Sequence, residues 1–123
     1  MAVLSTPEIR ARLRGDFRTW FDTHDAIQRK FKFETFNESI LFVNKVAAEA
    51  EKRQHCPDMC INNNAVGVVL STESAGGVTE KDFELAAAIN EIARSIPGYQ
   101  AARLRTTAAA ASTAAASGRE GWV

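Results

Sequence analysis

The side chains most suited to chemistry lie around the end of one predicted helix. His55 and Cys56 stand side by side where Pro57 stops that helix, because proline cannot continue a helical turn. An apolar run at 66–70 follows and leads to Glu73. If that run is a strand packed against the helix, Glu73 returns close to His55. The order of residues therefore predicts a pocket with one imidazole, one thiol and one carboxylate.

These groups suit proton transfer better than metal binding or nucleophilic catalysis. An imidazole serves as acid and base near neutral pH, whereas a thiol with a pKa of about 8.5 and a carboxylate of about 4.3 are poorer substitutes. The adjacent pair His55 and Cys56 is badly spaced for one metal ion, and Cys60 completes no Cys-x-x-Cys pair, so no metal is expected. The negative end of a helix also disfavours a thiolate at Cys56.

Three helices are predicted to position these groups. Ser5-Thr6-Pro7-Glu8 begins a helix that Gly15 ends, and Thr79-Glu80-Lys81-Asp82 begins another that runs to Pro97. The middle helix starts at the capping box of Thr35 and Glu38 and ends near Gln54. Its predicted apolar stripe is wide enough to suggest a second contact, such as the same helix of another subunit. That stripe comprises Phe36, Ile40, Val43, Ala47 and Ala50, widened by Phe42 and Val46.

Four strands are predicted between these helices. The first hairpin joins 17–22 to 26–33, and in its second strand Ile27, Phe31 and Phe33 share a face that only Arg29 interrupts. The second hairpin joins 59–62 to 65–71 through Asn63-Asn64. The predicted fold class is α+β: a four-stranded antiparallel sheet with three helices on one face, in the order α-β-β-α-β-β-α.

The composition limits the classes of protein to which the chain can belong. The chain has 123 residues with 15 basic and 15 acidic side chains, a balance that argues against nucleic-acid and membrane partners. No secretory signal is recognised, and two cysteines fit a reducing cytoplasm. One domain is predicted over 1–98. The segment 99–123 is rich in Ala, Ser and Thr, and we expect a flexible tail there.

The residues around His55 also resemble a known family. Glu51-x-x-x-His55-x-Pro57, then a hairpin, Leu70-Ser71-Thr72, a glycine-rich turn and Asp82, is similar to the signature of pterin-4a-carbinolamine dehydratase. The family pattern has a His-His pair before the proline, an aromatic residue six positions after it, and Ser-Thr-His before the turn. The resemblance places Cys56 at the second histidine, Asn63 at the aromatic position and Glu73 at the third histidine. It therefore implies a degenerate pocket at Glu51, His55, Cys56, Asn63, Glu73 and Asp82.

This resemblance implies a function without catalysis. One branch of the family lacks the catalytic histidines and acts as a Rubisco assembly factor associated with α-carboxysomes. We expect the chain to be such a factor, a cytoplasmic homodimer that needs no cofactor. Its partner would be the Rubisco large subunit or an assembly intermediate, with carboxysome association. Two alternatives remain open, namely a dehydratase with an atypical site and a dimerisation cofactor for another protein.

Overall fold

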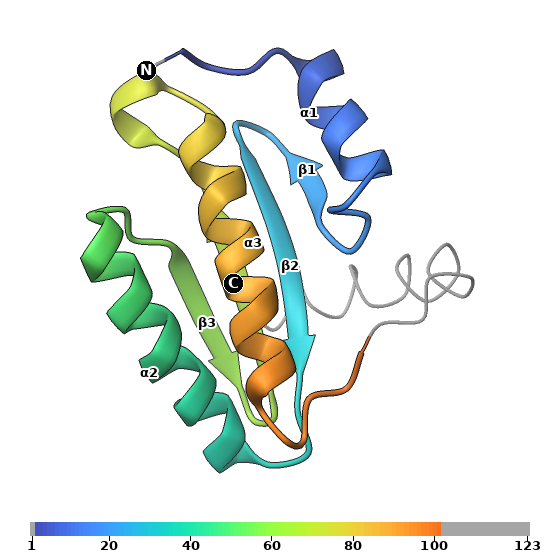
Figure 1. Ribbon diagram of the computed structural model, residues 1–123, viewed down its shortest axis with the longest axis vertical. Coiled ribbons are helices and arrows are strands. Elements are labelled where there is room, and N and C mark those ends of the chain that lie inside the picture. Colours follow the sequence, from blue (N-terminus) through green and yellow to red (C-terminus); the bar gives the residue numbers. More distant parts are fainter. Residues whose placement is uncertain (1, 102–123) are drawn as a thin grey trace.

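Two antiparallel hairpins join through their second strands into one sheet (Figure 1). The computed structural model describes residues 2–101 and orders the strands β1-β2-β4-β3. The strands are β1 (Phe21–Thr23), β2 (Ala26–Lys32), β3 (Asp58–Asn62) and β4 (Ala65–Leu70). The helices are α1 (Thr6–Arg14), α2 (Phe36–Arg53) and α3 (Glu80–Ser95), with a short 3-10 turn η1 (Glu73–Ala75) before α3. This arrangement confirms the predicted α+β class and element order.

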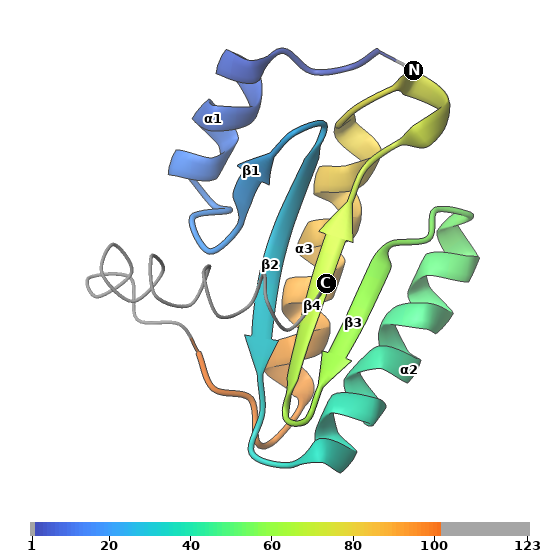
Figure 2. The same cartoon turned by 180° about the vertical axis from the view of Figure 1, so that it is seen from behind.

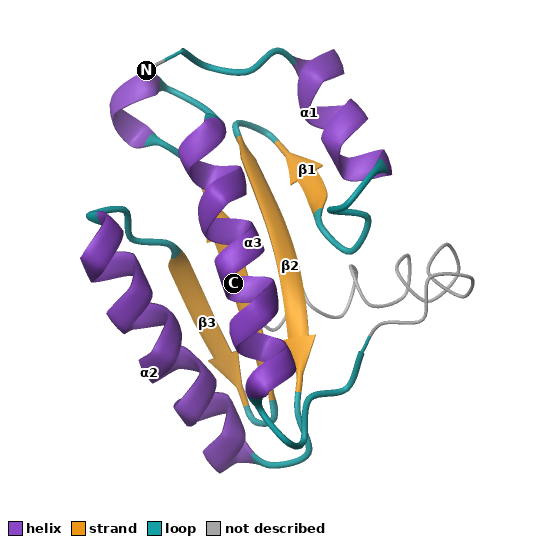
Figure 3. Ribbon diagram, in the orientation of Figure 1, coloured by secondary structure: helices purple, strands orange, loops and turns teal. Residues whose placement is uncertain are grey.

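The sheet register follows from the alternation in β2. Ile27 pairs with Leu70 and Phe31 with Val66, so the apolar side chains of both central strands share one face. Helix α3 covers that face, and seen from behind the strands lie in front of α3 (Figure 2). The secondary-structure view gives the same two layers, with α2 along β3 and α1 beside β1 (Figure 3).

The first predicted strand is longer than the observed one. We expected a strand over 17–22, but β1 contains only Phe21–Thr23 and residues 15–19 form turns. The aromatic side chains ahead of β1 pack on α3 instead of continuing the sheet. Phe17 meets Phe83 edge-on with ring centroids 5.0 Å apart, and Trp20 Nε1 donates to Asn90 Oδ1 at 2.9 Å. Packing onto the helix therefore overrides strand propensity at this position.

The predicted apolar stripe of α2 is rotated relative to the buried one. Ser39, Phe42, Val46 and Ala50 are buried, whereas Phe36 is 51% exposed and Ala47 is also exposed. At 100° per residue, the centre of the predicted stripe and the centre of the buried stripe lie about a quarter of a turn apart on the helix. Both lines are apolar, so the sequence pattern does not identify which one faces the sheet. The partly exposed stripe of Phe36, Ile40, Val43 and Ala47, which we call the outer line of α2, is available for another contact.

The end of α3 ties the chain back to the start of α2. Gly98 N donates to Glu38 Oε2 at 2.8 Å, and Gln100 N donates to Lys32 O at 2.8 Å. Tyr99 packs against the core, so the two residues after the predicted boundary at 98 still contact the domain. The rest of the predicted tail, 102–123, lies outside the described residues. Among the described helices, none combines the length and apolarity needed to span a membrane.

Candidate functional site

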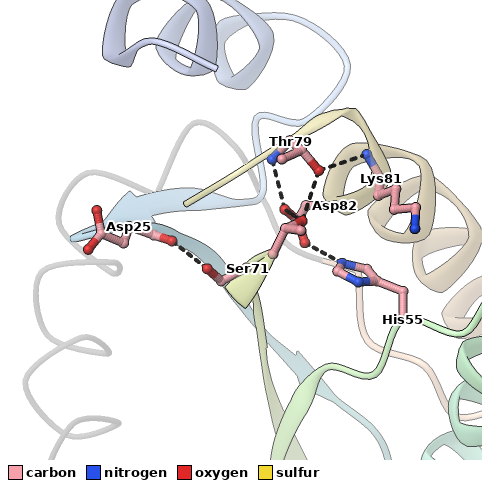
Figure 4. A network of polar contacts seen from close by, with 7 residues as sticks. Asp25, His55, Ser71, Thr79, Lys81 and Asp82 are labelled. Atoms are coloured by element: carbon pink, nitrogen blue, oxygen red, sulfur yellow. Dashed lines mark hydrogen bonds and ion pairs between the residues drawn. The ribbon is translucent and has the colours of Figure 1, made fainter. Parts of the chain in front are cut away.

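The end of α2 places His55 against the beginning of α3. Gln54 caps α2 in the left-handed conformation with φ 54°, and His55 N then donates to Ala50 O at 3.0 Å. This sharp end turns the imidazole toward α3. His55 Nε2 lies 2.6 Å from Asp82 Oδ1, and the histidine side chain is only 11% exposed (Figure 4).

Asp82 belongs to the capping box that starts α3. Its Oδ2 accepts hydrogen bonds from Thr79 N and from Thr72 Oγ1, each at 2.8 Å. Thr79 Oγ1 lies 2.8 Å from Thr72 Oγ1 and accepts from Lys81 N at 3.3 Å. The Asp82 side chain is fully buried. We call His55, Thr72, Thr79 and Asp82 the His55 network, in which every hydroxyl and both carboxylate oxygens have a partner.

This geometry fixes what the imidazole can do. With Asp82 as a carboxylate, Nε2 of His55 carries the hydrogen and donates it to Oδ1. The other ring nitrogen, Nδ1, then keeps its lone pair and can accept a proton from a bound molecule. A buried carboxylate that orients a histidine in this way also stabilises the imidazolium that forms. The His55 network can therefore take part in general acid–base chemistry.

The structure distributes the other predicted site residues differently. The free thiol of Cys56 is exposed, Glu73 lies exposed in η1, and neither makes an ion pair or hydrogen bond with His55. The carboxylate that meets the imidazole is Asp82, not Glu73 as the chain order suggested. Asn63 lies at the far end of β3 in a left-handed turn with φ 58°. The expected pocket of imidazole, thiol and carboxylate is thus replaced by an imidazole–carboxylate pair.

Glu51 lies on the exposed side of the last turn of α2, and its backbone carbonyl accepts from Gln54 N at 3.1 Å. Sequence reasoning missed the roles of Thr72 and Thr79 in this site. The signal available was the capping-box spacing of Thr79 and Asp82, which fixes one of the two contacts to Oδ2. Thr72 is brought in by pairing of its backbone with Gly77 across the turn.

Two surface hollows of the described residues lie away from His55. A smaller one, about 260 Å³, is bordered by Leu4, Ile9 and Val78, and a larger one, about 510 Å³, by Arg29 and Tyr99. Over residues 2–101, no group of three His, Cys, Asp or Glu side chains is placed to hold a metal ion.

The sheet with its flanking helices and the histidine–carboxylate pair define a pterin dehydratase-like protein. A family model described as pterin 4 alpha carbinolamine dehydratase matches residues 2–92. The chain belongs to the pterin-4a-carbinolamine dehydratase family. A Sulfolobus acidocaldarius protein named "Putative pterin-4-alpha-carbinolamine dehydratase" is 46% identical over 89 residues, which is 72% of this chain and 97% of that relative.

Two solved structures are similar to this fold. A transcriptional coactivator/pterin dehydratase from Brucella melitensis has a TM-score of 0.67 and 38% identity, covering 73% of this chain and 97% of its own. A pterin dehydratase-like protein identified as a RuBisCO assembly factor in the alpha-carboxysome has a TM-score of 0.51 and 16% identity. It covers 59% of this chain and 84% of its own, and at that identity the likeness shows the fold alone.

Proposed function

We propose that the chain is a pterin-4a-carbinolamine dehydratase whose His55–Asp82 pair carries out proton transfer. The observation that carries this proposal is the 2.6 Å contact between His55 Nε2 and the fully buried Asp82. The names of relatives that are 46% and 43% identical support the same activity. We therefore propose a reduced rate of dehydration in place of the loss of activity that was expected from the sequence.

The reaction eliminates water from a carbinolamine. The bond between the ring carbon and its hydroxyl oxygen breaks, a neighbouring ring N–H loses its proton, and a C=N bond forms. His55 Nδ1 takes the ring proton, and Asp82 stabilises the resulting imidazolium. The imidazolium then gives this proton to the departing hydroxyl, which leaves as water and returns His55 to its neutral form. With Cys56 and Glu73 in place of two further imidazoles, a single acid–base group serves both steps.

A stopped-flow assay of carbinolamine dehydration tests this assignment. We expect the wild type to exceed the uncatalysed rate and His55→Gln to lose about 10²-fold or more of that acceleration. The matched control is His24→Gln, because that imidazole is 95% exposed and lies outside the His55 network. The double variant Cys56→His/Glu73→His should gain at least about tenfold, since it restores the family's other two imidazoles. A His55→Gln rate equal to wild type would refute the assignment.

A wild-type rate equal to the uncatalysed one would instead favour the hypothesis of a Rubisco assembly factor without catalytic activity. The replacements at Cys56, Asn63 and Glu73 support that hypothesis, and the assembly factor at 16% identity adds only a shared fold. Its test is co-expression with form I Rubisco large and small subunits, followed by the yield of assembled hexadecamer on a native gel. A higher yield than with an empty vector would favour an interaction with the large subunit or an assembly intermediate, and carboxysome association would then be tested by co-purification with carboxysomes.

We also propose that the chain forms at least a twofold homodimer through the outer line of α2. Phe36 and Ala47 are exposed there, and Ile40 and Val43 are only partly buried. Apolar surface of this kind on a helix favours a second copy of itself. Light scattering should give at least a dimer mass for wild type and a smaller mass for Phe36→Glu/Ala47→Glu. Ala48→Glu, also exposed on α2, is the control, and a monomeric wild type at micromolar concentration would exclude the proposal.

A further inference from the structure

Arg29 is a buried cation with no acidic partner among the described residues. It is 6% exposed and lies on the α3 side of the sheet. Its Nη1 donates to Asn90 Oδ1 at 2.7 Å, its Nη2 donates to the Tyr99 hydroxyl, and the guanidinium lies 4.2 Å from the centre of the Phe31 ring. These neutral partners occupy two of its five N–H donors. They leave the positive charge without a counter-charge.

The charged groups around Arg29 increase this imbalance. Arg29 borders the larger hollow, about 510 Å³, which we call the Arg29 hollow. Arg18 and Arg94 also border it, and the only acidic side chain in its lining is Asp16. Arg94 Nη1 pairs with Glu91 at the exposed rim at 2.6 Å, whereas Arg18 makes no ion pair within residues 2–101. The full lining comprises Gly15, Asp16, Arg18, Thr19, Arg29, Asn90, Arg94, Tyr99 and Ala101.

Hydrogen-bond donors are in excess in the same place. Asn90 Oδ1 accepts from both Trp20 Nε1 and Arg29 Nη1, at 2.9 and 2.7 Å. The amide nitrogen of Asn90 has no hydrogen bond to any described residue, although Asn90 is only 7% exposed and borders the hollow. A site with spare donors and spare positive charge is complementary to an oxyanion.

Burial has an energetic cost at this position. Removal of Arg29 from water lowers the pKa of its guanidinium below the ordinary value; Tyr99 raises it again, and the nearby charge of Arg94 lowers it further. A buried charge is stabilised when it gains an opposite charge and hydrogen bonds together. A bound anion would supply both to Arg29.

We propose that the Arg29 hollow binds a small anionic metabolite, with its carboxylate or phosphate group held by Arg29, the Asn90 amide and the flanking Arg18 and Arg94. The volume lies within the range of small-molecule sites, roughly 300–1,000 Å³. The site is separate from the His55 network, because Asn90 follows Asp82 by eight residues, or about 12 Å along α3. It therefore does not depend on the proposed dehydratase activity.

The test is titration of the full chain with inorganic phosphate and, separately, with succinate. Chloride keeps the ionic strength constant, and calorimetry and thermal unfolding report binding. We expect saturable binding of at least one of the two anions to wild type. Arg18→Ala/Arg94→Ala should weaken it about tenfold or more, because each charge-assisted hydrogen bond has an effect of that order. A response to phosphate alone identifies a phosphate ligand, a response to succinate alone identifies a carboxylate, and either result supports the site.

Control variants test whether the anion binding is specific to the Arg29 hollow. Arg10→Ala/Arg53→Ala removes the same charge outside the hollow and should leave the affinity unchanged. His55→Gln should also bind normally, which separates this site from the catalytic proposal. Arg29→Met should abolish binding; Arg18→Ala/Arg94→Ala retains Arg29 and tests the site even if Arg29→Met fails to fold. Absence of saturable binding for both anions, or equal losses in the two double variants, would overturn the proposal.

Discussion

The His55 network and the Arg29 hollow each bury a charged side chain beside α3, but they compensate it differently. Asp82 is met by an imidazole, a hydroxyl and a backbone N–H, so its charge is matched on both oxygens. Arg29 is met by a neutral amide oxygen, a phenol and an aromatic ring. A closed network of this kind stabilises the fold and orients a reactive group. An incompletely compensated charge leaves binding energy available to a ligand.

The largest difference should come from Asp82→Ala. This change removes three hydrogen bonds and leaves Thr79 N, Thr72 and His55 without their acceptor in a buried setting. We expect the free energy of unfolding, measured in urea, to fall by about 3 kcal/mol or more. Asp16→Ala, an exposed aspartate in the Arg29 hollow, should stay within about 0.5 kcal/mol of wild type. Similar losses for the two variants would remove the contrast between the regions.

A smaller effect is expected from Thr72→Val, which keeps the shape of the side chain and removes its hydroxyl. Thr79 Oγ1 then loses its acceptor and Asp82 Oδ2 loses one donor, at a cost of about 1–2 kcal/mol. Thr19→Val is the control in the lining of the Arg29 hollow, and it should have little effect on urea unfolding. If Thr72→Val unfolds at the same urea concentration as wild type, the network is less closed than the distances indicate.

Arg29→Met should cost less than Asp82→Ala, about 1 kcal/mol or less without added anion. The methionine fills the space of the aliphatic part of the Arg29 side chain and removes an uncompensated charge. Such replacements often leave the free energy of unfolding unchanged. In wild type, an anion at 100 times its Kd should add about 2.7 kcal/mol to unfolding, and Arg29→Met should lack this gain. A loss as large as that of Asp82→Ala in anion-free buffer would show that the neutral partners alone make Arg29 structural.

The smallest effect should come from an exposed ion pair that serves as a reference. Arg12 Nη1 donates to Glu80 Oε1 at 2.7 Å and joins α1 to α3. The hydrogen bond from Arg12 lowers the pKa of Glu80 below its ordinary value of 4.5. Because the folded pKa is the lower one, the stabilisation is present at pH 7 and is lost as the pH falls below that ordinary value. Glu80→Gln should therefore lower Tm by about 1 °C or less at pH 7, and the difference should shrink as the pH falls below 4.5 and through the lowered folded pKa.

The order of elements was predictable because local chemistry determines it. The helices begin at Ser5, Thr35 and Thr79 as predicted, Thr35 pairs with the expected Glu38, and the alternation along 26–33 places Phe31 and Phe33 in the core as predicted. The rotation of α2 was not predictable in the same way. Phe36 and Phe42 are equally apolar, and only the position of the helix over β3 and β4 decides that Phe42 is buried.

The residues of the site were predictable, but the carboxylate that contacts His55 was not. His55 and Asp82 were both candidates, and Asp82 was separately predicted to cap α3. Glu73 had the more direct path back to His55 along the chain, yet η1 keeps it at the surface. The partners of Arg29 depend on where α3 and the turn that follows it place Asn90 and Tyr99. Interruption of an apolar strand face by Arg29 was the only advance sign of the hollow.

One carboxylate, Asp82, starts a helix and orients an imidazole at the same time. Mutational drift that ended the chemistry would still face selection against losing Asp82, because the start of α3 depends on it. His55 contributes less to the fold, because its loss would leave Oδ1 of Asp82 without a partner but would keep the start of α3. In a set of related genomes, retention of the aspartate without the histidine would then indicate a domain that still folds after the reaction has been lost.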